Sequence, residues 1–248
     1  MVVEYKRCPT SGISDELAKL IEEAYAATSY EQHFNIGLSG GSLPGLLMTA
    51  LENVTLPDWK KFRFMFCDER CVSFESEDST FGVYRKLIGE IHQKSGPEVV
   101  PISLSQFITI DPSLKNSKCA DDYQSKVRRH FQLSNAASSP PKFDILFLGV
   151  GPDGHTCSLF PNHKLLKETS KWVAFIGDSP KPPPERVTFT YQVLNNSKLC
   201  VFVATGKGKA EIIKEILVDK KPYPARLVEP THGKTIWLVD DEAGSLLP

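Results

Sequence analysis

The feature that most constrains the fold is an apolar run, Phe143–Leu148, which ends in a cluster of glycines. Apart from Asp144, the run lacks the polar alternation of a half-buried strand, so it predicts a strand buried on both faces, as at the centre of a parallel sheet. In open α/β sheets, ligands bind beyond the carboxyl ends of the strands. We therefore expect the next segment, Gly149–His155, to line a functional site.

Other apolar runs continue this arrangement along the chain. Strands are expected at 34–38, 62–67, 173–176, 187–191, 201–204 and 235–239, and helices at 17–25, 43–54, 81–91, 120–131 and 212–217. Ser14 is expected to start the first helix, and Ser79 or Thr80 to cap the third. The segment 95–116 reads as an irregular connection. Strands that alternate with helices predict a doubly wound α/β fold, with a mostly parallel sheet and helices on both faces.

We expect one domain that spans residues 1–248, although length alone does not decide between one large core and two small ones. A chain of 248 residues with 41% hydrophobic and 24% charged content can bury one large α/β core. The loop-like segment Ser134–Pro141 is followed at once by the central strand, so we interpret it as a loop within that domain. The formal net charge of -1 gives no reason to expect nucleic acid or a membrane as a partner.

The first residues of the chain, the lengths of its apolar stretches and its cysteines indicate the cellular compartment. The first ten residues lack the apolar core of a signal peptide, and no stretch is long enough to span a bilayer, so we expect a cytoplasmic protein. The six cysteines contain no CxxC pair, which is typical of reduced, mostly buried thiols. Cys67 and Cys71 are a poor half-site for zinc because no second pair follows.

Gly149–Gly154 spells GxGxxG, the spacing of a dinucleotide-binding loop. Two residues disfavour that interpretation. Asp153 would place a carboxylate where a pyrophosphate needs N–H donors, and Pro161 interrupts the helix that should follow. The Pro-Asp-Gly sequence of this segment is also typical of a simple β-turn.

Four places in the chain are candidates to bind an anion. In Ser39-Gly40-Gly41-Ser42, the glycines let backbone N–H groups approach an oxyanion and the following helix adds its positive end, although a tight turn also needs glycine. Lys209 is expected in the first turn of a helix, where a cation is unfavourable unless an anion is bound. Arg70 and Arg186 stand at expected strand or loop ends, and arginine suits forked contacts to phosphate. Solvated side chains and surface salt bridges are the alternatives.

His155 is the only one of six histidines placed directly at the carboxyl end of a predicted buried strand. This position suits a general base, although a lone histidine is more often structural. A Cys157 thiol nucleophile paired with His155 is disfavoured, because a two-residue spacing in a tight turn need not bring the side chains together.

Five segments together closely resemble the 6-phosphogluconolactonase family. They are GLSGGS at Gly37–Ser42, DER at Asp68–Arg70, FDILFLGVGPDGHTCSLFP at Phe143–Pro161, SPKPPPERVTFT at Ser179–Thr190 and ATGKGKA at Ala204–Ala210. The resemblance covers nearly the whole chain. Glucosamine-6-phosphate deaminases look similar through Asp-Gly-His but continue toward Phe-Asn-Glu-Pro, whereas this chain continues with Ser158–Pro161.

The resemblance implies a fold of the sugar-phosphate isomerase type and a function. That function is the hydrolysis of 6-phospho-D-glucono-1,5-lactone to 6-phosphogluconate, the second step of the oxidative pentose phosphate pathway, without metal or cofactor. His155 is implied as the base, and Asp153 would orient His155 or the sugar. The implied substrate-binding residues are Ser39, Gly40, Gly41, Ser42, Asp68, Arg70, Gly151, Arg186 and Lys209.

Some choices stay open at this point. Asp68 is expected either to bind substrate or to brace Arg70. An amino-sugar-phosphate isomerase or deaminase and a sugar-phosphate sensor without catalysis are the alternative functions. A monomer is the favoured assembly, with a small sugar-phosphate lactone as its partner.

Overall fold

A computed structural model describes residues 4–29, 32–55, 58–134 and 139–248 of the chain. Within these residues, seven parallel strands form the central sheet in the order β1-β10-β9-β6-β2-β3-β5. Their bounds are β1 Glu4–Cys8, β2 Phe34–Leu38, β3 Phe62–Phe66, β5 Phe107–Ile108, β6 Ile145–Gly149, β9 Leu199–Ala204 and β10 Lys234–Asp240. The strand predicted from the apolar run, β6, pairs with β2 and β9 near the centre of the sheet. The predicted parallel α/β fold is confirmed.

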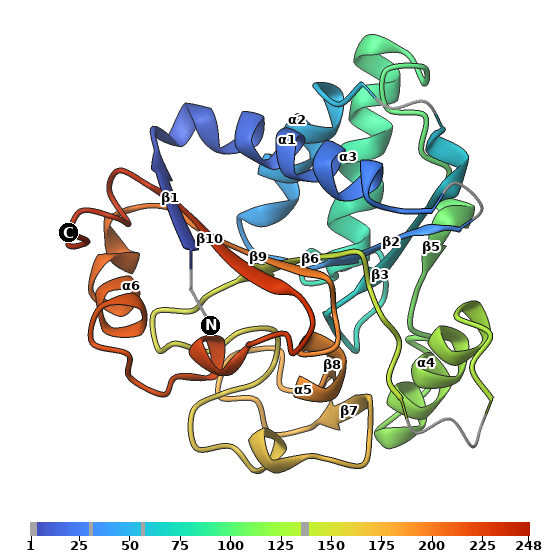
Figure 1. Cartoon of the computed structure of the whole chain (residues 1–248). Helices are drawn as coiled ribbons and strands as arrows, with labels where there is room; N and C mark the ends of the chain where they lie inside the picture. Colours follow the sequence, from blue (N-terminus) through green and yellow to red (C-terminus); the bar gives the residue numbers. More distant parts are fainter. Residues whose placement is uncertain (1–3, 30–31, 56–57, 135–138) are drawn as a thin grey trace.

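Two helical layers cover the sheet (Figure 1). One layer holds α1 Ile13–Ala26, α2 Leu43–Glu52 and α3 Thr80–Ser95, and the other holds α4 Ser117–His130, α5 Tyr191–Leu194 and α6 Ala210–Leu217. Because side chains alternate along a strand, Ile145 and Phe147 of β6 pack in the first layer, and Leu146 and Leu148 in the second. Burial of each such side chain contributes about 1.5–3 kcal/mol. This division into two cores explains why β6 is apolar on both faces.

Asp144, the polar residue of the apolar run, lies just before β6 and is buried. Its carboxylate accepts hydrogen bonds from the Asn35 backbone N–H (2.7 Å), the Thr28 hydroxyl (3.2 Å) and the Lys198 ammonium (2.6 Å). Asp144 therefore ties β6 to its two neighbours at their amino ends, away from the predicted site.

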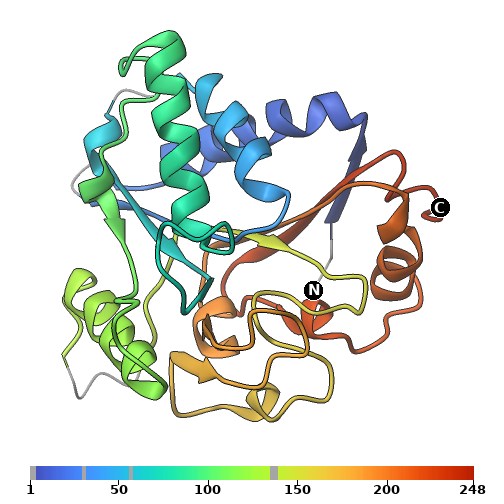
Figure 2. The ribbon, with the colours of Figure 1, turned by 180° about the vertical axis from the view of Figure 1, so that it is seen from behind.

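A second, antiparallel sheet was not predicted from the sequence. It consists of β4 Asp68–Arg70, β8 Arg186–Phe189 and β7 Val173–Ile176, in that order. Cys67 is the corner between the sheets, because its N–H donates to Leu38 of β2 while its carbonyl accepts from Phe189 of β8, both at 2.7 Å. The chain thus leaves the main sheet directly after β3. Seen from behind, α2 and α3 lie together on one side of the main sheet, and α4 lies beside the small sheet (Figure 2).

Several expected boundaries differ from the structure. Ser14 lies inside α1 rather than before it, and its hydroxyl donates to the Leu46 carbonyl (3.0 Å) instead of capping the helix. Ser79 is the N-cap of α3, as one of the two alternatives predicted, and accepts a hydrogen bond from the Gly82 N–H. The strand expected at 187–191 ends at Phe189. The segment 95–116 is mostly irregular, as expected, but contains the two-residue strand β5.

Short 3₁₀ segments complete the described chain: η1 Thr10–Gly12, η2 Trp59–Lys61, η3 Leu104–Gln106, η4 Lys164–Lys167, η5 Lys207–Lys209 and η6 Pro224–Leu227. Of the expected loop 134–141, residues 135–138 lie outside the described residues. Pairing of β1 with β10 joins distant parts of the chain and supports a single domain, which stays a prediction. Among the described helices, none combines the length and the apolar composition that crossing a membrane requires.

Candidate active site

The carboxyl ends of β2, β6 and β9 meet the small sheet at a cavity of about 260 Å³. Ten residues proposed from the sequence line this cavity: Ser39, Gly40, Gly41, Ser42, Asp68, Arg70, Gly151, His155, Arg186 and Lys209. Asp153 contacts His155 rather than lining the cavity itself. Residues that are far apart in sequence are thus brought together where the fold predicts a ligand.

The segment after β6 is a turn that presents His155. The Gly154 N–H donates to the Gly151 carbonyl (2.9 Å), and the Gly151 N–H donates to the His155 carbonyl (2.8 Å). Gly154 has a φ of +78°, which favours glycine. The β-turn interpretation is confirmed. A dinucleotide-binding loop would lead into a helix, whereas the next helical segment described here is η4, so that alternative does not fit.

Replacement of Gly151 with Ala is expected to lower kcat/KM for the lactone that the family resemblance implies, roughly tenfold to a hundredfold. A Cβ at this position would lie 1.9 Å from His155 Nδ1, so the imidazole has to move, and displacements of about 1 Å can cost about a hundredfold in rate. Gly45→Ala is the control, because that exposed position of α2 has no atom within 4 Å of an added Cβ. Steady-state kinetics of the two variants check the prediction, and equal activity in both would contradict it.

His155 and Asp153 form a close pair. Nδ1 of His155 lies 2.5 Å from Oδ1 of Asp153, so Nδ1–H donates to the carboxylate and Nε2 is left as the proton acceptor. The imidazole ring also packs against Phe160, with 4.7 Å between ring centroids. Burial lowers the pKa of His155, although Asp153 raises it, so the neutral ring is favoured. The pair has the geometry of an oriented general base.

Arg186 and Asp68 lie side by side and are both buried. The Arg186 guanidinium donates to the carbonyls of Lys181, Pro182 and Pro183 at 2.9–3.0 Å, and its Nη1 lies 4.0 Å from Asp68 Oδ2. Asp68 also accepts a hydrogen bond from Ser158 (2.8 Å). The cation next to Asp68 is therefore Arg186, a pairing outside the two alternatives that the sequence left open for Asp68, namely to bind substrate or to brace Arg70. Burial lowers the pKa of Arg186, and the charge of Asp68 opposes that effect.

Arg70 and Ser39 carry buried polar atoms without a protein partner in the described chain. Arg70 donates through Nη1 to the Asp78 carbonyl (2.9 Å), but its Nε is unpaired, as are the hydroxyls of Ser39 and Thr80. An unpaired buried polar group costs about 1–3 kcal/mol, so these atoms favour a polar ligand. They lie near the N-termini of α2 and α3, which favour anions.

Lys209 approaches the cavity from the start of α6. It is the N-cap residue rather than a residue of the first turn, and its ammonium donates to the Val150 carbonyl (2.6 Å). Burial lowers its pKa. Lys209 therefore sits beside the turn that carries His155, where it can meet an anionic ligand.

Cys157 lines the cavity, but its thiol is not suited to act as a nucleophile. A hydrogen bond with Cys67 and burial both raise the pKa of the Cys157 thiol, which disfavours the nucleophilic thiolate. Cys71 interacts with Cys119 instead of Cys67. No group of three side chains suited to hold a metal ion lies together in the described parts of the chain.

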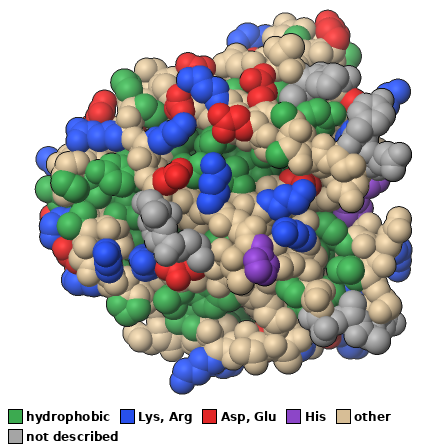
Figure 3. Space-filling view, viewed as in Figure 1, with side chains coloured by type: hydrophobic (Ala, Val, Ile, Leu, Met, Phe, Trp, Pro, Cys, Tyr) green, Lys and Arg blue, Asp and Glu red, His purple; other side chains and the backbone are tan. Residues whose placement is uncertain are grey.

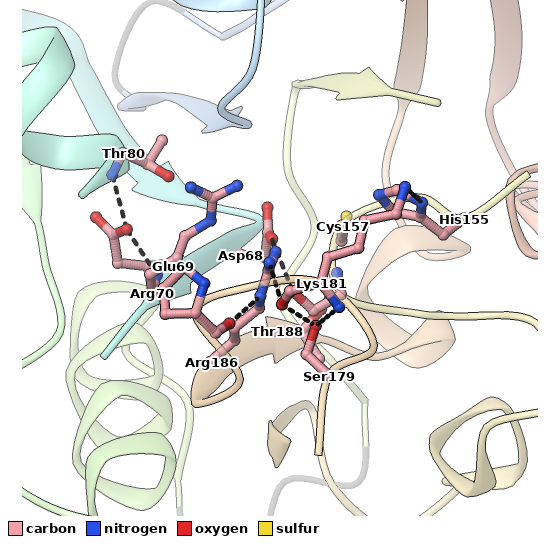
Figure 4. A network of polar contacts seen from close by, with 12 residues as sticks. Asp68, Glu69, Arg70, Thr80, His155, Cys157, Ser179, Lys181, Arg186 and Thr188 are labelled. Carbon is pink, nitrogen blue, oxygen red and sulfur yellow. Dashed lines mark hydrogen bonds and ion pairs between the residues drawn. The ribbon is translucent and has the colours of Figure 1, made fainter. Parts of the chain in front are cut away.

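Sequence reasoning missed Lys181. Its ammonium lies 3.3 Å from both Asp153 Oδ1 and His155 Nδ1, on the loop between β7 and β8 (Figure 4). The sequence marks this lysine only as the residue before a proline run, and prolines predict a loop without showing where that loop packs. It also missed the buried, unpaired hydroxyl of Thr80, because the sequence marked Thr80 only as a possible helix cap.

The chain matches, over residues 10–237, a family described as glucosamine-6-phosphate isomerases/6-phosphogluconolactonase. The chain belongs to this family. The 6-phosphogluconolactonase of Bos taurus is 49% identical over 221 residues (86% of this chain, 81% of the relative), and that of Homo sapiens is 46% identical over 239 residues (93% and 88%). The predicted resemblance is confirmed.

Solved structures of this family are also similar to the chain. The 6-phosphogluconolactonase of Trypanosoma cruzi has a TM-score of 0.83 at 25% identity, with 99% of this chain and 97% of that one covered. That of Thermotoga maritima has a TM-score of 0.78 at 26% identity, with 96% and 100% covered. Both agree with the α/β fold described above.

Proposed function

We propose that the chain hydrolyses 6-phospho-D-glucono-1,5-lactone to 6-phosphogluconate, the second step of the oxidative pentose phosphate pathway. The observation that carries this proposal is the Asp153-oriented imidazole of His155 at a cavity that also holds Arg70, Arg186 and Lys209. A base and several cations in one cavity suit an anionic ester. The names of relatives that are 46–49% identical support the same substrate.

In the proposed reaction, His155 Nε2 accepts a proton from a water molecule as its oxygen adds to the lactone carbonyl. Asp153 stabilises the imidazolium that results, because it already accepts a hydrogen bond from Nδ1. When the tetrahedral intermediate collapses, the bond between the carbonyl carbon and the ring oxygen breaks. The imidazolium then returns its proton to that oxygen. General-base catalysis contributes about 10²–10⁴-fold, so an activated ester needs no covalent intermediate.

We assign the phosphate to the side of the cavity formed by Ser39–Ser42 and Arg70. The unpaired Ser39 hydroxyl and Arg70 Nε support this assignment, as does the N-terminus of α2 directly after Ser42. Figure 4 shows Arg70 and His155 on opposite sides of Asp68, which suits a ligand with its phosphate and its carbonyl at opposite ends. Arg186 and Lys209 line the same cavity, and we assign them to the phosphate as further cations. Asp68 and Gly151 are assigned to the sugar.

The charge on the surface agrees with a small-molecule partner. Figure 3 shows acidic and basic side chains interspersed over one face, without a large area of a single sign. The cytoplasmic location and the monomeric state stay predictions.

Turnover of freshly prepared lactone, measured above its spontaneous hydrolysis, tests the proposal. Product is followed by coupling to 6-phosphogluconate dehydrogenase and NADP⁺. We expect hydrolysis that depends on His155. Tight binding without turnover would instead indicate a sensor, and ammonia release from glucosamine-6-phosphate would indicate a deaminase.

Lys209→Met is expected to lower kcat/KM for the phosphorylated lactone about tenfold to a hundredfold, mainly through KM. A hydrogen bond to a charged group contributes about 1.5–3 kcal/mol, and about 1.4 kcal/mol is tenfold. Unphosphorylated gluconolactone should be affected much less.

Lys207→Met is the matched control, because Lys207 is an exposed lysine of the same 3₁₀ turn and does not line the cavity. An equal loss on both lactones, or in both variants, would remove Lys209 from the phosphate site.

A further inference from the structure

Lys181 is held at the His155–Asp153 pair by contacts of its own backbone. Its carbonyl accepts hydrogen bonds from the Ser179 hydroxyl (2.8 Å) and from Arg186 Nη2 (2.9 Å), and its N–H donates to the Ser179 hydroxyl (3.2 Å). Arg186 is itself buried and paired with Asp68. The position of the lysine is therefore set by the small sheet.

The contacts of its ammonium are of two kinds. Lys181 Nζ donates to Asp153 Oδ1 (3.3 Å), the same oxygen that accepts from His155 Nδ1–H. Nζ also lies 3.3 Å from Nδ1 itself. Both nitrogens carry N–H groups and neither can accept, so no hydrogen bond forms between them. The contact is tolerable while the imidazole is neutral. It becomes a repulsion between two cations when the ring is protonated.

We propose that Lys181 is a positioning residue that fixes the Asp153 carboxylate and keeps the His155 imidazole neutral, and hence able to accept a proton from water. This inference rests on the proposed function for the role of His155. In the same reaction, repulsion from Lys181 favours the return of the proton from the imidazolium to the departing ring oxygen.

The charges around His155 agree with this role. Burial lowers the pKa of His155 and the Lys181 charge lowers it further, while Asp153 and Asp68 raise it. The other charged groups of the cavity wall are Arg70, Arg186 and Lys209. Lys181 is the cation in contact with the Nδ1 side of the ring. Its removal therefore leaves the effect of Asp153 and Asp68, which raise the pKa of His155, less opposed by positive charge.

The test is the titration of the His155 imidazole by NMR in the wild type and in Lys181→Met, with His155→Gln to assign the signal. We expect the midpoint to rise by about one pH unit in Lys181→Met, because a like charge in contact disfavours the charged form. Lys181→Arg should keep the wild-type midpoint. Lys86→Met, on the exposed side of α3, is the control and should not move it. An unchanged midpoint in Lys181→Met would overturn the proposal.

The pH profile of kcat/KM is the second measurement. The acidic limb should move upward by the same amount in Lys181→Met, so that activity is lost mostly at low pH. A lysine that only binds substrate would lower kcat/KM equally at every pH, which would contradict the proposal. The NMR titration needs no turnover, so failure of the lactonase proposal and failure of the Lys181 proposal give different results.

Discussion

Replacement of His155 with Gln is expected to lower kcat/KM for the phosphorylated lactone about 10²–10⁴-fold, with most of the loss in kcat. This range is the usual contribution of a positioned general base. Gln keeps much of the size of the imidazole, and hence its packing on Phe160, but it has no group that accepts a proton at neutral pH. The measurement is steady-state hydrolysis with the spontaneous rate subtracted.

The chain contains a matched control for this variant. His163 lies 3.1 Å from Asp178, which makes it a second histidine–aspartate pair, but neither residue lines the cavity. His163→Gln should leave kcat/KM within about twofold of the wild type, because this pair does not face the cavity. Near-full turnover in His155→Gln would remove His155 as the base.

His155 was readable from the sequence because its determinants are local. A run of apolar residues predicts a buried strand, and Pro-Asp-Gly predicts a turn after it, so the histidine is placed at the edge of the sheet without knowledge of any distant contact. The same holds for Ser39–Ser42, where a glycine segment joins a strand to a helix. These residues lie at the cavity as predicted.

The small antiparallel sheet could not be read in this way. β4 is three charged residues long, so it lacks the alternation that identifies a strand, and its pairing with β8 joins residues more than a hundred positions apart. The pairing decides which side chains meet: it places Arg70 opposite Arg186 and brings Asp68 beside the latter. The sequence left Asp68 either to bind substrate or to brace Arg70, and it did not indicate the ion pair with Arg186. β1 was missed because it is an exposed, polar edge strand.

Each of the two sheets contributes residues to the proposed site. The main sheet contributes the turn of His155 and the Ser39–Ser42 segment, whereas the small sheet contributes Asp68, Arg70 and Arg186. Cys67 is where the chain passes from one to the other. The geometry of the cavity therefore depends on the attachment of β4, the strand that follows this corner.

Glu69 of β4 makes that attachment, and Glu69→Ala is expected to lower the free energy of unfolding by about 3 kcal/mol. The buried carboxylate accepts hydrogen bonds from the backbone N–H groups of Arg70 (2.7 Å), Thr80 (2.8 Å) and Phe81 (2.7 Å), and from the Ser79 hydroxyl (3.3 Å). Thr80 and Phe81 begin α3, so an anion there also favours the helix dipole. Burial raises the pKa of Glu69 while the backbone hydrogen bonds lower it. The carboxylate therefore stabilises the folded state by less than the sum of its hydrogen bonds.

Chemical denaturation measures this loss, which corresponds to a fall in Tm of about 6–12 °C for a chain of this size. Glu75→Ala is the control: Glu75 lies between β4 and α3, is exposed, and pairs with Arg85 at the surface, so its removal should cost less than about 0.5 kcal/mol. Because Arg70 directly follows Glu69, the folded fraction of Glu69→Ala should also show a raised KM for the phosphorylated lactone. Equal stability of the two variants would mean that β4 is held by its pairing with β8 alone.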